Sequence, residues 1–234
     1  MKKKAQTALI HAPRRAPQYI QTVQPPLFRA STIIFENTDA LFNRHWTDAY
    51  DYSYGTHGTP TTFTLADQIA QLEGGEYCLL APSGLSAINL VNSCFLSQGD
   101  EVWVADNIYG PNMEHLRNLE QRYGITVQVY NPIDVDSFQP SAQAKLIWLE
   151  AAGSVTLEFP NLTALVKKAK SHHMLTALDN TWGAGLAFNA FDFGDDHLSV
   201  DISVHAFLGV DDFDKAVPGR HAGHADGAQV VRQR

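Results

Sequence analysis

The chain has 234 residues, 44% of them apolar, and a formal net charge of −8 at pH 7. This size and composition allow a sizeable buried core and predict a globular protein. A negative chain without a long basic run gives no electrostatic reason to expect nucleic acid or an anionic membrane surface as a partner.

Membrane insertion and secretion are not expected either. No stretch of the sequence approaches the ~20 consecutive apolar residues that span a bilayer, and prolines interrupt the basic N-terminal stretch before an apolar segment of signal-peptide length. We therefore expect a cytoplasmic protein. The two cysteines, Cys78 and Cys94, lie in apolar surroundings and are expected to be buried, reduced thiols.

The first predicted elements are an arm and a helix. Residues 1–52 show little periodicity and are predicted to form an extended N-terminal arm. Residues 61–73 then place Leu65, Ile69 and Leu72 at helical spacing and end at Gly74, which predicts a helix.

Beyond this helix, short apolar runs alternate with amphipathic segments. This alternation predicts an α/β fold with a mostly parallel sheet and helices on both faces. Residues 53–206 would form this domain, and the glycine-rich, aperiodic residues 207–234 would form a coil. The predicted strands are 77–81, 101–105, 125–130, 145–149, 174–178 and 200–204, and the predicted helices are 84–96, 111–123 and 162–172.

Ligands of such sheets bind at the carboxyl ends of the strands, where several loops carry suitable residues. Ser83-Gly84 precede a helix, whose N-terminal N–H groups could bind a phosphate, or Ser83 could simply cap that helix. Asp179 ends an apolar strand and could pair with a protonated ring nitrogen, or could cap the turn at Thr181. Tyr109 could stack on a planar cofactor or pack at the rim. The residues alone leave these alternatives open.

Several separate segments, in sequence order, resemble the Cys/Met-metabolism family of enzymes that depend on pyridoxal 5'-phosphate (PLP). The Asp-Asn-Thr-Trp form at 179–182, together with Leu149-Glu150, is more similar to cystathionine β-lyases than to the γ-synthases or γ-lyases. The segments that carry the resemblance are 25–32 (PPLFRAST), 54–61 (YGTHGTPT), 72–75 (LEGG), 83–84 (SG), Tyr109 and 179–185 (DNTWGAG).

The resemblance implies a fold, a cofactor and a set of contacts. The fold is the large domain of the PLP-dependent, aspartate-aminotransferase-like fold type I, here incomplete. Gly84 and Leu85 would bind the phosphate through backbone N–H groups, and Asp179 would pair with the ring nitrogen. Tyr109 would stack on the ring. The complete set of implied cofactor-binding residues is Tyr54, Ser83, Gly84, Leu85, Tyr109, Asp179 and Thr181.

The same resemblance implies an activity and an assembly. The activity is β-elimination of cystathionine to homocysteine, pyruvate and ammonia, a transsulfuration step of methionine biosynthesis, so the substrate is a small sulfur amino acid. Tyr54 would reach the phosphate of a neighbouring subunit, which implies a homo-oligomer with shared sites.

The sequence departs from the family after residues 200–206, which resemble the strand leading to the Schiff-base lysine. The family continues with a hydroxyl residue and then lysine, whereas this chain has Leu208 and Gly209. The lysine amine forms the imine with the cofactor and moves the α-proton, which glycine cannot do. Lys215 comes six residues later, roughly 20 Å of extended chain. We therefore expect no catalytic residue and, at best, non-covalent PLP.

The family's C-terminal domain also has no counterpart, and the tail resembles nothing in the family. We hypothesise that a change of reading frame or a truncation replaced the lysine and the residues beyond it. Two functions remain open: a cystathionine β-lyase-like enzyme, or a non-catalytic remnant that binds PLP or forms oligomers.

Two other kinds of site are not expected. His221 and His224 lie in a glycine-rich tail without a helical face or cysteine partners, so no metal site is predicted. Ser83 lacks the Gly-x-Ser-x-Gly elbow of a hydrolase nucleophile.

Overall fold

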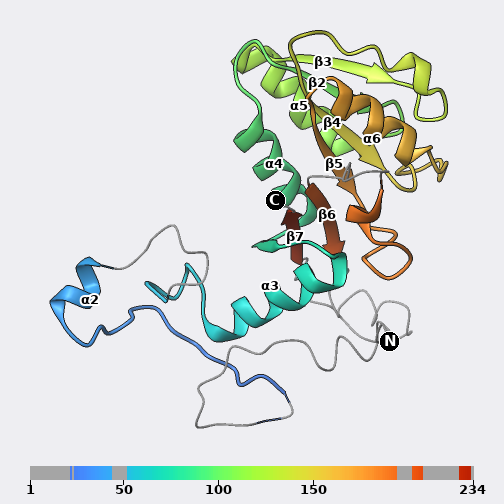
Figure 1. Cartoon of the computed structure of the whole chain (residues 1–234). Helices are drawn as coiled ribbons and strands as arrows, with labels where there is room; N and C mark the ends of the chain where they lie inside the picture. The colour runs from blue at the N-terminus through green and yellow to red at the C-terminus, as the bar shows by residue number, and fades with distance from the viewer. Residues whose placement is uncertain (1–21, 23, 44–51, 194–201, 208–226, 233–234) are drawn as a thin grey trace, which may run out of the picture. The chain divides into compact units, whose positions relative to one another are not determined.

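The computed structural model describes residues 22, 24–43, 52–193, 202–207 and 227–232, the last two ranges by their backbone (Figure 1). The chain divides into two compact units, Met1–Gln71 and Leu72–Arg234. Each unit is described by itself. Helix α3 (Pro60–Glu73) lies largely in the first unit.

In the first unit, a side chain of helix α3 binds the backbone of the extended segment that precedes it. Thr61 Oγ1 donates to the carbonyl of Pro26 at 2.9 Å and accepts from the N–H of Phe28 at 2.8 Å. Thr32 and Tyr54 form an isolated antiparallel bridge. The segment predicted as an extended arm also contains a short helix, α2 (Thr38–Phe42), whose first turn is capped by the side chain of Asn37.

Helix α3 confirms the predicted helix and part of its predicted buried stripe. Ile69 is buried and Leu72 half-buried, whereas Leu65 is 48% exposed, and Phe63, Ala66 and Ala70 are buried in addition. Helical periodicity identified the element correctly, but several apolar stripes were compatible with it and the sequence pattern did not select among them.

The second unit is built on a seven-stranded sheet in the order β1-β7-β6-β5-β4-β2-β3. Strand β7 pairs antiparallel with both β1 and β6, and the other pairings are parallel. The predicted mostly parallel sheet is thereby confirmed. The strands are β1 (Tyr77–Ala81), β2 (Glu101–Ala105), β3 (Thr126–Tyr130), β4 (Ala144–Glu150), β5 (Leu175–Asp179), β6 (Ile202–Phe207) and β7 (Gly227–Arg232).

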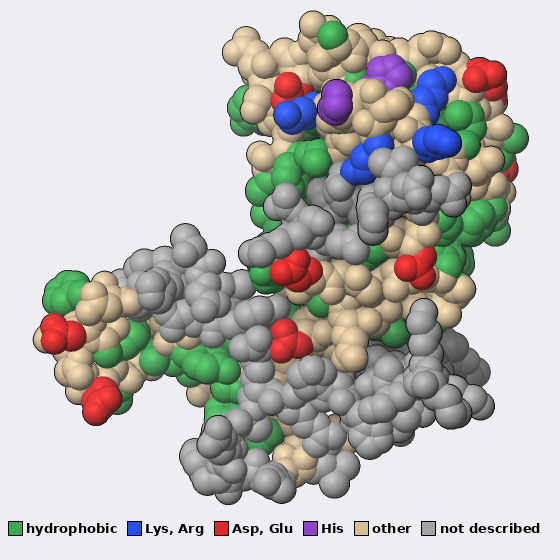
Figure 2. Space-filling view, in the orientation of Figure 1, with side chains coloured by type: hydrophobic (Ala, Val, Ile, Leu, Met, Phe, Trp, Pro, Cys, Tyr) green, Lys and Arg blue, Asp and Glu red, His purple; other side chains and the backbone are tan. Residues whose placement is uncertain are grey.

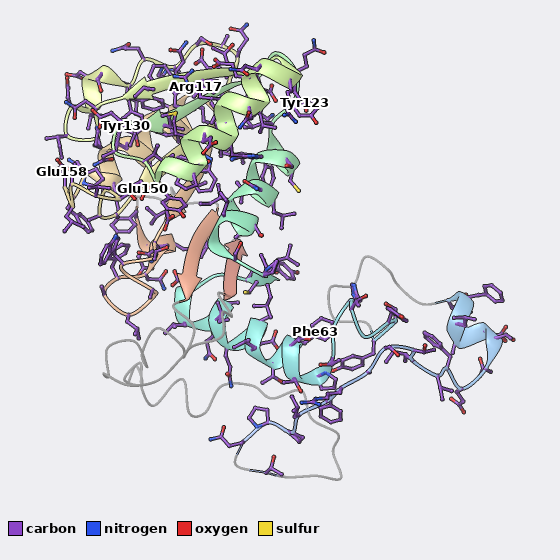
Figure 3. All side chains as sticks on the ribbon, turned by 180° about the vertical axis from the view of Figure 1, so that it is seen from behind. Phe63, Arg117, Tyr123, Tyr130, Glu150 and Glu158 are labelled. Carbon is purple, nitrogen blue, oxygen red and sulfur yellow. The ribbon has the colours of Figure 1, made fainter. Side chains whose placement is uncertain are left out.

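Helices cover both faces of this sheet. Figure 1 shows α6 (Leu162–Ser171) in front of the strands, and the view from behind in Figure 3 shows α5 (Gly110–Tyr123) in front of them. Helix α4 (Gly84–Phe95) comes after β1, and the short 3-10 helices are η1 (Val135–Ser137) and η2 (Ala190–Asp192). As predicted, α5 ends at Gly124, whose φ of 69° favours glycine.

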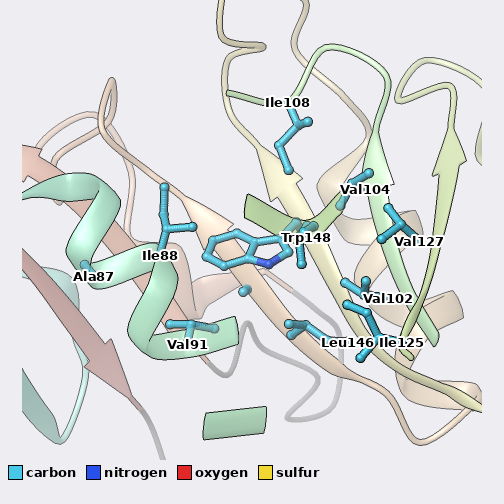
Figure 4. Close-up of a cluster of buried hydrophobic side chains, with 12 residues drawn as sticks. Ala87, Ile88, Val91, Val102, Val104, Ile108, Ile125, Val127, Leu146 and Trp148 are labelled. Carbon is cyan, nitrogen blue, oxygen red and sulfur yellow. The ribbon is translucent and has the colours of Figure 1, made fainter. Parts of the chain in front are cut away.

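The core of the second unit lies between α4, α5 and the central strands (Figure 4). Ile88 and Val91 of α4 pack with Val104 of β2 and Trp148 of β4, all of them buried. Burial of such side chains stabilises the fold by roughly 1.5–3 kcal/mol for each. The remaining members are Ala87, Val102, Ile108, Leu116, Ile125, Val127, Leu146 and Ala177.

A buried polar relay crosses this core. The indole N–H of Trp148 donates to Asn92 Oδ1 at 2.8 Å, and Asn92 Nδ2 donates to Asn112 Oδ1 at 3.0 Å. Because buried polar groups are costly without partners, the relay fixes how α4, α5 and β4 pack together.

Two features differ from the sequence predictions. Residues 227–232 of the tail, predicted as coil, form strand β7, which lies between the edge strand β1 and β6. Both cysteines are free thiols, but Cys78 is half-buried and Cys94 is exposed, so the predicted burial of Cys94 is wrong.

Within the described ranges, no helix is long and apolar enough to cross a membrane.

Candidate functional site

The predicted ligand-binding residues of the second unit come after strands that end at one edge of the sheet. Ser83 lies beyond β1, Tyr109 beyond β2, and Asp179 is the last residue of β5. Strand β6, next to β5, ends at Phe207 on the same edge. Parallel strands therefore bring residues that are far apart in sequence to a common surface, as expected for this architecture.

The beginning of α4 offers an anion-binding group. Ser83 is the N-cap, and its Oγ accepts from the N–H of Ser86 at 3.1 Å. Among the described residues, the N–H groups of Gly84 and Leu85 have no hydrogen-bond partner. The capping interpretation of Ser83 is therefore confirmed, and it leaves two N–H groups at the positive end of the helix dipole available to a phosphate.

Asp179 is held by the turn that comes after it. Its Oδ1 accepts from the backbone N–H of Thr181 at 3.0 Å and from the Thr181 hydroxyl at 2.6 Å. Asp179 is half-buried at the end of a strand whose preceding three residues are buried. Thr181 therefore orients the Asp179 carboxylate, which is then able to face a cationic group.

A second carboxyl group lies beside Asp179, and sequence reasoning assigned it no role. Glu150 ends β4 in register with Asp179 on β5, so both side chains leave the same face of the sheet. Glu150 is only 5% exposed, and its Oε1 accepts from the backbone N–H of Tyr109 at 2.8 Å. The available signal was a charged residue at the end of the apolar strand AKLIWLE.

Burial and, to a smaller extent, the nearby Asp179 charge raise the pKa of Glu150, the N–H of Tyr109 partly opposes them, and the resulting pKa is about 8. Glu150 therefore carries a proton at neutral pH. Tyr130, near Glu150 in Figure 3, is buried and donates its hydroxyl to the carbonyl of Trp148 at 3.0 Å. Burial and then the charges of Glu150 and Asp106 raise the pKa of Tyr130.

Tyr109 occupies the N-cap position of α5, and its side chain is 39% exposed. A ring that is partly open to solvent at the ligand edge is able to stack on a planar group. Tyr54 belongs to the first unit, where its side chain is 44% exposed and its carbonyl accepts from the N–H of His57 at 2.9 Å.

The groups of the second unit fit a pyridine ring that carries a phosphate. The ends of β1 and β5 are separated by two intervening strands, which corresponds to about 14 Å at normal strand spacing. An anion-binding helix terminus therefore lies at one end of this span and a carboxylate for a protonated nitrogen at the other. An elongated ligand with those two charges is complementary to the edge.

The described lysines lie elsewhere. Lys145 is near the start of β4, at the opposite edge of the sheet. Lys168 and Lys170 are in the last turn of α6, which leads into the beginning of β5. Figure 2 shows Lys, Arg and His side chains gathered on this α6 face. Gly209, Lys215 and the tail histidines lie outside the described residues.

A cavity of about 780 Å³ lies between the C-terminal halves of α4 and α5 and is lined by His115, Asn118 and Arg122 among others. None of the predicted cofactor-binding residues lines it. The candidate site is therefore distinct from this cavity. Within the part of the chain that the structure describes, no group of three or more His, Cys, Asp or Glu side chains could hold a metal ion.

The chain is similar to known enzymes over most of its length. A cystathionine beta-lyase, so named provisionally, from Rhizobium johnstonii is 35% identical over 203 residues, 86% of this chain and 49% of that protein. Cystathionine beta-lyase MetC of Escherichia coli is 32% identical (87% and 52%). L-alanine/L-glutamate racemase of Wolbachia pipientis is also 32% identical (87% and 52%). The chain spans about half the length of these curated relatives.

Solved structures and a family model agree with these relatives. A Campylobacter jejuni protein, provisionally an O-acetylhomoserine (thiol)-lyase and containing N'-pyridoxyl-lysine-5'-monophosphate, matches with a TM-score of 0.83 at 22% identity. The match covers 100% of this chain and 55% of that one. The model of the Cys/Met metabolism PLP-dependent enzymes matches residues 6–208. This chain therefore belongs to the Cys/Met-metabolism family of enzymes that use pyridoxal phosphate.

Proposed function

We propose that this chain binds PLP non-covalently at the carboxyl edge of its sheet, as the cofactor-binding part of a cystathionine β-lyase-like protein. We propose further that the chain does not turn over substrate by itself. The names of the Rhizobium and Escherichia coli relatives support the lyase class, and the family supports the cofactor.

One observation carries the proposed inactivity. Strand β6 lies between β5, which ends in Asp179, and β7, and it ends at Phe207 on the ligand edge. The residues directly after this strand would have to supply the amine, and they are Leu208 and Gly209. Without a tethered amine there, the chain lacks the group that would attach the cofactor and move the α-proton.

In this proposal each described residue has a part that its geometry supports. The N–H groups of Gly84 and Leu85 bind the phosphate, and Ser83 caps the same helix. Asp179, oriented by Thr181, holds a proton on the ring nitrogen, which allows the bound cofactor to act as an electron sink.

The remaining contacts come from tyrosines. Tyr109 covers one face of the ring. Tyr54 reaches the phosphate of a neighbouring copy in a homo-oligomer. The substrate class is a sulfur amino acid such as cystathionine.

The direct test is to mix the purified chain with PLP, reduce the mixture with borohydride and map the peptides, while measuring pyruvate release from cystathionine. We expect reversible PLP binding, no reduced adduct at any lysine and no pyruvate. A stoichiometric adduct on Lys215, or pyruvate release at ordinary enzymatic rates, would overturn the proposed inactivity.

A gain-of-function variant tests the position of the missing amine. The double substitution Leu208→Thr and Gly209→Lys should yield a borohydride-reduced PLP adduct at residue 209. Val210→Lys in the otherwise unchanged chain is the matched control, because it adds the same amine one residue later. Equal labelling of the two lysines would mean that the edge does not orient an amine at 209.

A racemase is the second candidate, because the Wolbachia relative is as similar as the Escherichia coli lyase. As a racemase the unchanged chain would also be inactive, since amino-acid racemisation with PLP requires a base at the α-carbon. The Leu208→Thr, Gly209→Lys chain is therefore to be assayed on L-alanine and on cystathionine. Conversion of alanine alone would favour the racemase.

A further inference from the structure

Glu150 lies between the two residues proposed to contact the cofactor ring. The sheet order places β4 between β5 and β2, so the end of β4 separates Asp179 from the loop that carries Tyr109. Glu150 interacts with both sides. It stands in register with Asp179, and it accepts the backbone N–H of Tyr109 at 2.8 Å.

The bond to Glu150 is what ties the backbone N–H of Tyr109 to the sheet. Tyr109 is the N-cap residue of α5, but its side chain makes no capping hydrogen bond. Its carbonyl already accepts from the N–H groups of Asn112 and Met113 within the helix. The orientation of the Tyr109 backbone, and with it the direction of the ring, therefore depends on the carboxyl group of Glu150.

The charge state of Glu150 is set by its surroundings. It is 5% exposed, and the groups that face it are Asp179 from β5 and Tyr130 from β3. Asp106, just after β2, acts on Tyr130. None of these groups is cationic. Burial and the charge of the adjacent Asp179 both disfavour a negative charge on Glu150, so its pKa is raised to about 8 and its neutral form prevails at pH 7.

We propose that Glu150 is a positioning residue for the cofactor ring: its carboxyl group accepts the backbone N–H of Tyr109 and so fixes the direction of the tyrosine ring relative to Asp179, which lies opposite the ring nitrogen. This role rests on the proposed function, because it assumes a ring between Tyr109 and Asp179. Neither the family membership nor the residues predicted from the sequence assign it.

The binding test uses 4'-deoxypyridoxine 5'-phosphate, which has no aldehyde and cannot react with lysine. At pH 7, Glu150→Gln should bind it within about twofold of the unchanged chain, because the amide is neutral and keeps an acceptor oxygen. Glu150→Leu should bind it about tenfold more weakly, because leucine cannot accept a hydrogen bond from the backbone N–H of Tyr109. Glu158→Gln is the control. Glu158 is an exposed carboxylate on another loop, and its Oε2 accepts from Asn107 Nδ2 at 3.0 Å.

A second readout needs no ligand. The backbone amide signal of Tyr109 in nuclear magnetic resonance spectra should shift with pH around a midpoint near 8, the pKa of Glu150. In the Glu150→Gln chain this shift should vanish, and in Glu158→Gln it should persist. This readout tests the raised pKa of Glu150 and its bond to Tyr109, and the binding test decides whether that bond positions the ring.

The outcomes separate the inference from the proposed function. If the unchanged chain binds the probe and Glu150→Leu binds it equally well, the positioning role fails and the cofactor site stands. If Glu150→Gln is as weak as Glu150→Leu, or if the Tyr109 midpoint lies near 4–5 as for an ordinary carboxyl group, the neutral state of Glu150 is wrong. If no form binds the probe, the cofactor site itself is wrong and the positioning role falls with it.

Discussion

At the scale of single residues, the pair formed by Glu150 and Asp179 dominates the chemistry of the sheet edge. Two carboxyl groups end neighbouring parallel strands, and their environments differ. Asp179 is stabilised as an anion by the N–H and hydroxyl of Thr181, whereas Glu150 is buried with a single N–H donor. Environment thus separates their protonation states, as it does in many sites that bind or move protons.

The unfolding free energy should decrease as pH rises because of Glu150. Its pKa is near 4.5 in the unfolded chain and about 8 in the folded one. Between these values only the folded state binds the proton, so stability falls with a slope of about 1.4 kcal/mol per pH unit for this one group. Glu150→Gln should remove that slope in urea unfolding measured from pH 5 to pH 8. Parallel pH profiles of the two chains would contradict the raised pKa.

Asp179 should contribute strongly to cofactor affinity. Replacement by asparagine removes the charge opposite the ring nitrogen, and we expect binding of 4'-deoxypyridoxine 5'-phosphate to weaken about tenfold to a hundredfold. Thr181→Val should have a smaller effect in the same direction, because it loosens the carboxylate without removing it. Asp136→Asn, on the exposed helix η1, serves as the control in a fluorescence titration. Unchanged affinity of Asp179→Asn would place the ring elsewhere.

The sequence predicted a site residue where the end of an apolar strand was evident, and it did not predict one whose role depends on residues distant in sequence. Asp179 was recognisable as a carboxylate ending an apolar strand. Glu150 ended a similar strand, but its neutral state depends on Asp179 and on the N–H of Tyr109, which lie 29 and 41 residues away in sequence. No local pattern contains that information.

At the scale of elements, the buried relay from Trp148 through Asn92 to Asn112 connects a strand to two helices. Asn92→Ala should lower the unfolding free energy by about 1–3 kcal/mol, because it leaves the indole N–H and the Asn112 amide without this partner in a dry core. Ser93→Ala, at an exposed neighbouring position of α4, should have almost no effect. Chemical unfolding monitored by tryptophan fluorescence measures both. Equal stabilities would show that the relay is dispensable.

Most elements were predicted because their apolar periodicity is local. Strands β2 and β4 are continuous apolar runs, and α6 has a clear buried stripe at Leu162, Leu165 and Val166. Strand β7 has the sequence GAQVVR in a glycine-rich tail, and nothing local distinguishes it from coil. It becomes a strand because β1 and β6 present hydrogen-bonding edges on either side of it, which is a tertiary effect.

At the scale of the whole molecule, the integrity of the sheet depends on the tail. Val230 of β7 pairs with Leu79 of β1 and Val204 of β6. Val230→Pro should therefore destabilise the chain by about 1–3 kcal/mol, since proline has no N–H to donate to a neighbouring strand and does not fit an interior strand. Gln233→Pro, just past the strand, is the control. Equal melting temperatures of the two variants would contradict the interior place of β7.

The pairing of β7 with β1 also has a consequence for how the chain is made. Tyr77 of β1 pairs with Arg232 of β7, so β1, which is synthesised early, keeps an open edge until the residues of β7 have left the ribosome. Contacts of such long sequence separation form slowly, and open edges attract other chains in the meantime. A nascent chain of this sequence should consequently depend on chaperones for longer than a protein whose sheet grows outward from neighbouring strands.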